Sequence, residues 1–197
     1  MNIGIIDFPF ELVNMTRYLQ DYPVALNAME LAANYHTGTR KDGLTPEFSH
    51  QLTMVKYLKS FFEYDDRSFT SDVYSVAFLH DVLEDYPQSC DVVTLRSKFG
   101  LLVAESVYDL TRQSGQKNDR YYKSIEQSEY SIIVKGADRL HNLSTMVDVF
   151  SKEKQRRYIK ETEEYIIPML KRNKDITSVE ITVMMMEALV NAIKKGL

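Results

Sequence analysis

The stretch SDVYSVAFLHDVLEDYP, residues 71–87, decides the fold class. Its apolar residues recur at the three-and-four spacing of an α-helix: Val76, Leu79, Val82 and Leu83. Ser71 or Asp72 is suited to cap the start of this helix, and Pro87 cannot continue it. The pattern therefore predicts one helix that begins at residue 71 or 72, runs through His80 and Asp81, and ends before Pro87.

The same helical spacing extends outward in both directions from this stretch. Helices are predicted for residues 21–35, 50–58, 91–100, 101–111, 117–127, 131–149, 151–167 and 178–194. The run Ile132–Val134 alone is typical of a strand, but three residues without a partner strand cannot build a sheet. The predicted fold class is all-α, a compact helical bundle.

Length and charge narrow the class of protein. The chain has 197 residues, and 44% of them are hydrophobic. Since a domain has roughly 100–200 residues, a single domain over residues 1–197 is expected. The 28 acidic and 24 basic residues give a net charge of −4. No global positive field is available to attract nucleic acid, so no nucleic-acid partner is expected.

The compartment follows from what the sequence does not contain. Cys90 is the only cysteine, which excludes an internal disulfide and a thiolate zinc cluster. No apolar run reaches the roughly 18 residues that a membrane span needs, and residues 1–15 do not have the pattern of a secretory signal. We therefore expect a cytoplasmic protein without a membrane partner. The sequence does not indicate an oligomeric state.

Four polar side chains gather within residues 77–86. On a continuous helix, His80 would lie above Glu84, and Asp81 above Glu84 and Asp85. Like charges at this spacing repel, and a bound cation would remove the penalty. The alternative interpretation is a solvated acidic helix end.

Two further stretches favour a metal site. The helix predicted at KGADRLHNLSTM, residues 135–146, carries Asp138, and His50 follows a loop rich in helix breakers at residues 37–47. Together with His80 and Asp81, these residues form a set of two imidazoles and two carboxylates. Such mixed ligands without a thiolate suit Mn²⁺, Fe²⁺ or a Co²⁺-like ion, and are less typical of structural Zn²⁺. An octahedral ion with four protein ligands keeps positions for water and a phosphate oxygen.

The sequence resembles the HD-domain phosphohydrolases, specifically the hydrolase domain of RelA/SpoT enzymes and their small single-domain relatives. The resemblance covers roughly residues 25–170. Its matching elements, in order, are His36 with Thr39-Arg40, PEFSH ending at His50, FLHDVLED, FG followed by VAESV, KGADRLHN followed by Thr145, EKQRR, Glu161-Thr162, and Tyr165 with Pro168. No synthetase half is expected after Leu197, so such a protein would only degrade its nucleotide.

This resemblance implies an enzyme of the stringent response. It implies that one divalent ion, usually Mn²⁺, is held by His50, His80, Asp81 and Asp138. The substrate would be the alarmone guanosine tetra- or pentaphosphate, (p)ppGpp, whose 3′-pyrophosphate is hydrolysed to give GDP or GTP and pyrophosphate. The catalytic pair would be Glu84 and Asp85, which position or deprotonate the attacking water or protonate the leaving oxygen.

Substrate contacts are expected from two places. The resemblance implies that Arg40 and Lys41 face the nucleotide and that Asn142 and Thr145 line the same pocket. An Arg guanidinium can stack on a purine, so the loop at residues 37–47 is our candidate for base recognition. The alternative is an ordinary surface loop with two solvated cations.

The remaining histidines are interpreted as structural. His36 is expected to support the site or to bond nearby backbone, and His141 is expected to be a satisfied structural histidine. Because only these two histidines are spare, one ion is favoured over a binuclear centre.

Two alternatives to alarmone hydrolysis stay open. The same site could act on another 2′- or 3′-phosphorylated nucleotide such as NADPH. For an alarmone substrate, the sequence does not distinguish a guanine from an adenine base. The protein could instead be a non-catalytic nucleotide-binding regulator, or an antitoxin that neutralises a partner synthetase. The complete ligand set and the acidic pair argue against a pure binder, which has no evident need of both.

Overall fold

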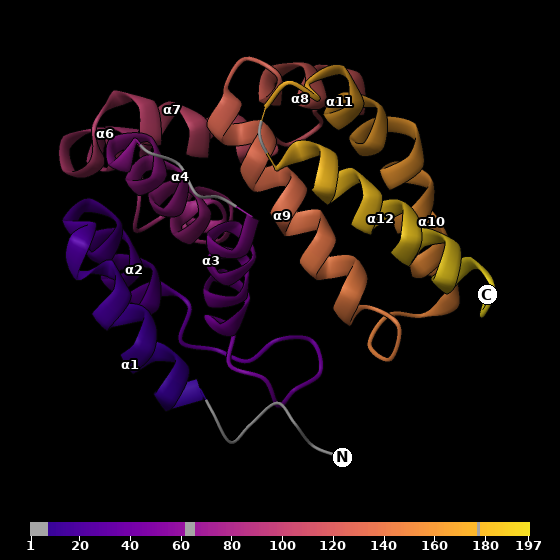
Figure 1. Ribbon diagram of the computed structural model, residues 1–197, viewed down its shortest axis with the longest axis horizontal. Coiled ribbons are helices and arrows are strands. Elements are labelled where there is room, and N and C mark those ends of the chain that lie inside the picture. Colours follow the sequence, from indigo (N-terminus) through magenta and orange to yellow (C-terminus); the bar gives the residue numbers. More distant parts are fainter. Residues whose placement is uncertain (1–7, 62–65, 177) are drawn as a thin grey trace. The chain divides into compact units, whose positions relative to one another are not determined.

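The fold is all-α, as predicted. The computed structural model describes residues 8–61, 66–176 and 178–197 (Figure 1). Within them, backbone pairing of the β type is confined to an isolated bridge between Thr39 and Pro46. No helix in the described ranges has both the length and the apolar composition that crossing a bilayer requires. The N-terminal stretch in which no secretory signal is expected begins outside the described residues.

The chain divides into two compact units, Met1–Thr111 and Arg112–Leu197. The helical elements of the first unit are α1 (Phe8–Tyr18), η1 (Leu19–Asp21), α2 (Pro23–Tyr35), α3 (Ser49–Phe61), α4 (Arg67–Leu79), α5 (Val82–Asp85), α6 (Val92–Phe99) and α7 (Leu101–Leu110). Those of the second are α8 (Asn118–Ile125), α9 (Glu129–Thr145), α10 (Lys152–Glu161), η2 (Thr162–Ile166), α11 (Ile167–Arg172) and α12 (Val179–Lys194). The single domain over residues 1–197 stays a prediction.

Helix α4 is the centre of the first unit. Every residue from Val73 to Leu79 is buried, and α2, α3 and α7 pack around it. The prediction that this helix begins at Ser71 or Asp72 is wrong. It begins at Arg67, because the side chain of Asp66 accepts the backbone N–H groups of Ser68 and Phe69.

Helix α9 has the corresponding place in the second unit. Its buried face includes Ile132, Ile133 and Val134, the run typical of a strand, and α12 and α11 pack against it. A Cβ atom on Gly136 would lie 3.2 Å from Thr182 Cγ2 on α12 and 3.5 Å from Leu170 Cδ2 on α11. Gly136 therefore allows these helices to approach α9 closely.

Other helix ends follow local signals, with exceptions. The side chains of Asp91, Ser128 and Ser151 each accept a backbone N–H at the start of a helix. Ser178 precedes α12 but does not cap it with its side chain, because its backbone is left-handed, with φ of 75°. The helix predicted for residues 151–167 contains a π-helical turn, η2, shortly before Pro168. Since proline has no N–H to donate, the regular hydrogen-bond ladder cannot continue through it.

An Asp109→Asn substitution is expected to stabilise the protein at alkaline pH. Burial and the negative charge of Glu105, one turn earlier on α7, raise the pKa of Asp109 to about 6. Above that pH the folded protein carries an unfavourable charge, whereas below the ordinary value of 3.8 the carboxyl group is neutral in both states. With allowance for solvent screening, the gain at pH 8 is about 1 kcal/mol.

Thermal unfolding of the parent protein and of Asp109→Asn, at pH 8 and at pH 3.5, measures the gain in stability. The difference in stability should be present at pH 8 and nearly absent at pH 3.5. A difference that grows as the pH falls would contradict the assignment.

Candidate metal centre

The His80-Asp81 pair lies in a turn rather than inside a helix. The expectation of one continuous helix through these residues is wrong: α4 ends at Leu79 and α5 begins at Val82. Consecutive side chains on a helix point about 100° apart. With Asp81 at φ −98° and ψ −8°, the two side chains instead meet, and His80 Nε2 lies 2.9 Å from Asp81 Oδ2. The turn thus aims two neighbouring residues at one point.

His50 reaches the same point from the start of α3. Helix α3 packs on α4, and the rings of Phe48 and Phe78 stack with their centroids 6.1 Å apart. This contact anchors the start of α3 beside the end of α4, and the His50 and His80 rings come within 5.2 Å of each other. One ligand atom each from His50, His80 and Asp81 lies within 4.8 Å of the other two.

The chemistry of these three donors fits a divalent cation. His80 Nδ1 lies 2.9 Å from the carbonyl oxygen of Ala77. A carbonyl can only accept, so Nδ1 carries the ring hydrogen and the lone pair is on Nε2, the atom beside Asp81. Both imidazoles are buried, whereas Asp81 is 39% exposed at its side chain. The group therefore combines two buried imidazoles, of which the Ala77 carbonyl orients that of His80, with a carboxylate that solvent can reach.

The acidic pair Glu84-Asp85 lies directly beyond this turn, on the short helix α5. The backbone N–H groups of both residues donate to the carbonyl oxygen of Asp81, over 3.1 and 2.8 Å. Both side chains are exposed. Partial burial of the carboxyl group, reinforced by the charges of Asp81 and Glu84, raises the pKa of Asp85 to about 6. The carboxyl group of Asp85 therefore keeps its proton to a higher pH than an ordinary aspartate does.

Asp138, the fourth predicted ligand, lies in the second unit, on α9. Its side chain is buried, Lys135 Nζ donates to its Oδ2 over 3.0 Å, and Asn142 donates to its Oδ1. Each carboxylate oxygen is thus oriented by a neighbour on the same helix. Its membership of the ligand set stays a prediction.

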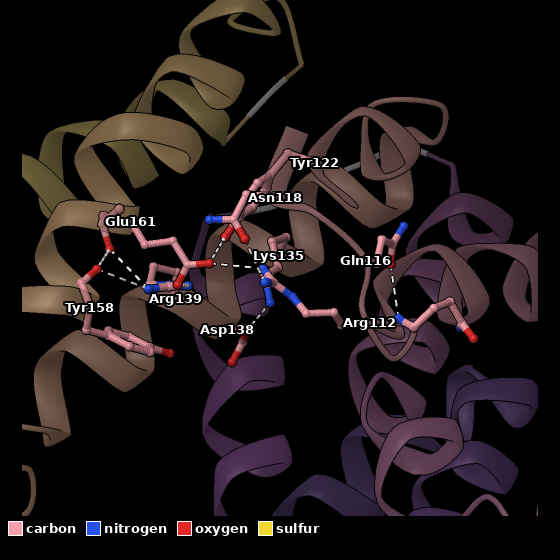
Figure 2. A network of polar contacts seen from close by, with 11 residues as sticks. Arg112, Gln116, Asn118, Tyr122, Lys135, Asp138, Arg139, Tyr158 and Glu161 are labelled. Atoms are coloured by element: carbon pink, nitrogen blue, oxygen red, sulfur yellow. Dashed lines mark hydrogen bonds and ion pairs between the residues drawn. The ribbon is translucent and has the colours of Figure 1, made fainter. Parts of the chain in front are cut away.

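A network of charged side chains supports α9 around Asp138 (Figure 2). Arg139 is buried, its guanidinium lies 3.7 Å from the centroid of the Tyr158 ring, and it donates to Glu161 Oε2 over 3.2 Å. Glu161 also accepts from Arg112 over 2.9 Å and from the Tyr122 hydroxyl over 3.0 Å. The carboxylate of Glu161, on α10, thus connects Tyr122 on α8, Arg139 on α9 and Arg112, which precedes α8.

The predicted substrate-binding residues lie in both units, and their role stays a prediction. In the first unit, Arg40 is half-buried and Lys41 exposed, on a loop closed by the bond from Arg40 N to the Thr45 carbonyl, 2.8 Å long. In the second, Asn142 donates to Asp138, and the exposed Thr145 donates its hydroxyl to the His141 carbonyl over 3.1 Å. Asn142 therefore orients Asp138.

A second polar group, around His36, was not predicted. His36 is buried, and its Nδ1 lies 3.6 Å from Glu47 Oε1. Donor atoms of His36, Glu47 and Asp85 lie within 4.8 Å of one another. Glu47 lies three residues before His50 in PEFSH, but one acidic residue in a loop is too weak a signal to indicate this role. Burial lowers the pKa of His36, against the opposing charges of Asp81 and Glu47, and so favours the neutral ring.

The chain belongs to the HD domain family, which matches residues 28–172. A probable guanosine-3′,5′-bis(diphosphate) 3′-pyrophosphohydrolase of Synechocystis sp. is 28% identical over 152 residues, which cover 72% of this chain and 19% of that protein. A probable chloroplastic GTP diphosphokinase of Arabidopsis thaliana is 25% identical over 198 residues, which cover 84% of this chain and 27% of that protein. The chain thus spans a fifth to a quarter of the length of these curated relatives.

The fold is similar to that of a solved structure described as a metazoan orthologue of SpoT that hydrolyses ppGpp. The TM-score is 0.65 at 17% sequence identity, and the likeness covers 86% of this chain and 94% of the other. These findings confirm the resemblance to HD-domain proteins of the RelA/SpoT type and the all-α bundle.

Proposed function

We propose that this chain is a metal-dependent hydrolase that removes the 3′-pyrophosphate of guanosine tetra- or pentaphosphate, or of the adenosine counterparts. The observation that carries the proposal is the convergence of His50, His80 and Asp81 next to the acidic pair Glu84-Asp85, in a chain of the HD family. The similarity to a probable 3′-pyrophosphohydrolase supports this substrate class.

The ligand set of the proposed centre is His50, His80, Asp81 and Asp138, with one Mn²⁺ as the resident ion. A divalent ion there would supply Lewis-acid activation of water and neutralisation of phosphate charge. The protein's contribution is to orient the donors: the Ala77 carbonyl holds the His80 ring, and Asn142 and Lys135 hold the Asp138 carboxylate.

Proton transfer is assigned to Glu84 and Asp85. Hydrolysis forms a bond between the water oxygen and the phosphorus attached to the ribose 3′-oxygen. It breaks the bond between that phosphorus and the 3′-oxygen. The attacking water loses a proton, and the leaving 3′-oxygen gains one. Two adjacent carboxyl groups that are reached by solvent provide one group to orient or deprotonate the water and one to protonate the leaving oxygen. The products are GDP or GTP and pyrophosphate.

Binding of the polyanionic nucleotide is assigned to Arg40 and Lys41 on the loop before α3 and to Asn142 and Thr145 on α9. The guanidinium of the half-buried Arg40 can stack on a purine or pair with phosphate oxygens. The substrate is a small molecule, without nucleic acid or membrane as a partner, and the proposed compartment is the cytoplasm.

A substrate panel tests the proposal. Purified protein with Mn²⁺ is offered guanosine tetraphosphate, its adenosine counterpart and NADPH, and the released group is identified. Pyrophosphate from an alarmone is the expected product. Orthophosphate from NADPH, with no pyrophosphate from any alarmone, would favour the alternative phosphatase.

A double variant separates the enzyme from a regulator or antitoxin. Changing Glu84 to Gln and Asp85 to Asn keeps both side chains close in size and should abolish turnover while the circular dichroism spectrum stays that of the parent. The matched control is Glu30→Gln, because Glu30 is an exposed residue of α2 and its substitution should leave turnover unchanged. Full biological effect of the double variant would contradict the enzymatic account.

A further inference from the structure

The inference concerns His36, whose side chain is 99% buried. Neither ring nitrogen has a hydrogen-bond partner within the described part of the chain. A neutral imidazole has one N–H donor and one acceptor, and leaving both unmet in a buried position is costly. The ring faces Glu47, yet the distance of 3.6 Å from His36 Nδ1 to Glu47 Oε1 is too long for a good hydrogen bond.

That distance is close to the separation of two ligands on a common ion. Nitrogen and oxygen ligands bind small divalent ions at about 2.1 Å, so two ligands at 90–110° lie about 3 to 3.5 Å apart. The third donor is a carboxylate oxygen of Asp85, within 4.8 Å of the donors of His36 and Glu47. One imidazole and two carboxylates are a ligand set that divalent cations accept.

The surroundings hold Glu47 in place. The backbone N–H of Glu47 donates to the Gly38 carbonyl over 2.9 Å, and the Tyr86 hydroxyl contacts Glu47 Oε2 at 3.4 Å. A Cβ atom on Gly38 would lie only 3.1 Å from that Oε2, so glycine leaves room for the carboxylate. The rings of Tyr86 and His36 pack in a T-shaped arrangement, with centroids 5.2 Å apart at 76°. Ligand orientation by neighbouring groups is typical of metal sites.

We propose that His36, Glu47 and Asp85 form a second divalent-cation site in the first unit, distinct from the group of His50, His80 and Asp81. The two groups share no residue. The site goes beyond the proposed function, which needs only one ion. It adds a cation beside Asp85, where it would attract the phosphate groups of an incoming nucleotide.

Counting bound Mn²⁺ tests the proposal. Equilibrium dialysis of the full chain against Mn²⁺ alone, followed by elemental analysis, should give two ions per chain. Glu47→Gln keeps the size of the side chain and removes its charge, and should reduce the count to one or weaken the second affinity at least tenfold. Asp81→Asn should also leave one ion, and a variant that combines Glu47→Gln with Asp81→Asn should bind none. Glu30→Gln, an exposed residue of the same unit, should leave two.

A second measurement does not depend on the count. In Asp81→Asn, where one ion should remain, paramagnetic Mn²⁺ should broaden the imidazole signals of His36, and Gly38→Ala should weaken the binding that causes this broadening. One ion in both the parent and Glu47→Gln would overturn the inference, as would unbroadened His36 signals. Two bound ions without pyrophosphate release would contradict the proposed function and leave this inference standing.

Discussion

Replacing Asp81 with Asn is expected to remove the ion of the proposed metal centre and to lower pyrophosphate release on the order of 10³-fold. The amide keeps the size of the side chain but has no negative charge and offers only one oxygen. Asp81 Oδ2 lies 2.9 Å from His80 Nε2, so the loss falls at the point where the donors converge. The backbone carbonyl that accepts from Glu84 and Asp85 is retained, and the turn should therefore persist.

Two measurements test this prediction. One is the initial rate of pyrophosphate release from guanosine tetraphosphate, and the other is the amount of Mn²⁺ that the protein retains. Asp21→Asn is the matched control, because Asp21 is exposed in the same unit and should change neither quantity. An Asp81→Asn variant that kept its rate and its metal content would refute the proposed centre.

The largest loss of stability is expected from Glu161→Gln. Glu161 compensates the buried Arg139 and the partly buried Arg112, and it accepts the hydroxyl of Tyr122. Removing one partner of a buried ion pair leaves a charge without compensation. Because Glu161 is 24% exposed at its side chain, the expected cost is reduced to about 2–3 kcal/mol.

The pH dependence distinguishes an ionic role from a steric one. Burial raises the pKa of Glu161, but the charge of Arg139 and the hydrogen bond from Tyr122 outweigh it, so the pKa lies below the ordinary 4.5. A carboxylate with a lowered pKa stabilises the fold above its ordinary pKa and loses this effect as the pH falls through the folded value. The difference between parent and variant should be full at pH 7 and shrink below about pH 4.5.

Glu163→Gln is the control for this comparison. Glu163 is exposed and pairs with the exposed Lys194, so its loss should cost at most about 1 kcal/mol. Thermal and urea unfolding of the three proteins at pH 7 and pH 3.5 give the comparison. Equal costs for the two variants, or a Glu161→Gln difference unchanged at pH 3.5, would contradict the role of the network.

Helical periodicity predicted the elements well and their ends less well. Apolar spacing through Val76, Leu79 and Leu83 indicated a buried helix, but spacing alone cannot detect the turn at His80-Asp81. A turn and a helix place nearby apolar residues on similar faces, and the difference appears only in the backbone angles of Asp81. The same limit applies at the start of α4, where Asp66 rather than Ser71 or Asp72 is the cap.

The sequence likewise predicted one part of the candidate site and not the other. The donor types and their order along the chain can be read in PEFSH, HD, ED and ADRLHN, and the family resemblance that these stretches carry predicted which residues would do chemistry. The sequence has no comparable sign that His36 and Glu47 meet, because the stretches in which they lie indicated a ligand only at His50. Their proximity depends on how the loop before α3 folds back, with Glu47 bonded to Gly38.

By itself the sequence determined the all-α class and the family resemblance, and it predicted candidate residues for binding a cation. These depend on side-chain chemistry and on periodicity, which are local properties. Only the tertiary structure decided that His50 meets His80 and Asp81, that Glu161 compensates two arginines, and that His36 faces two carboxylates. Such contacts join residues far apart in the chain, and packing of helices around α4 and α9 determines which of them meet.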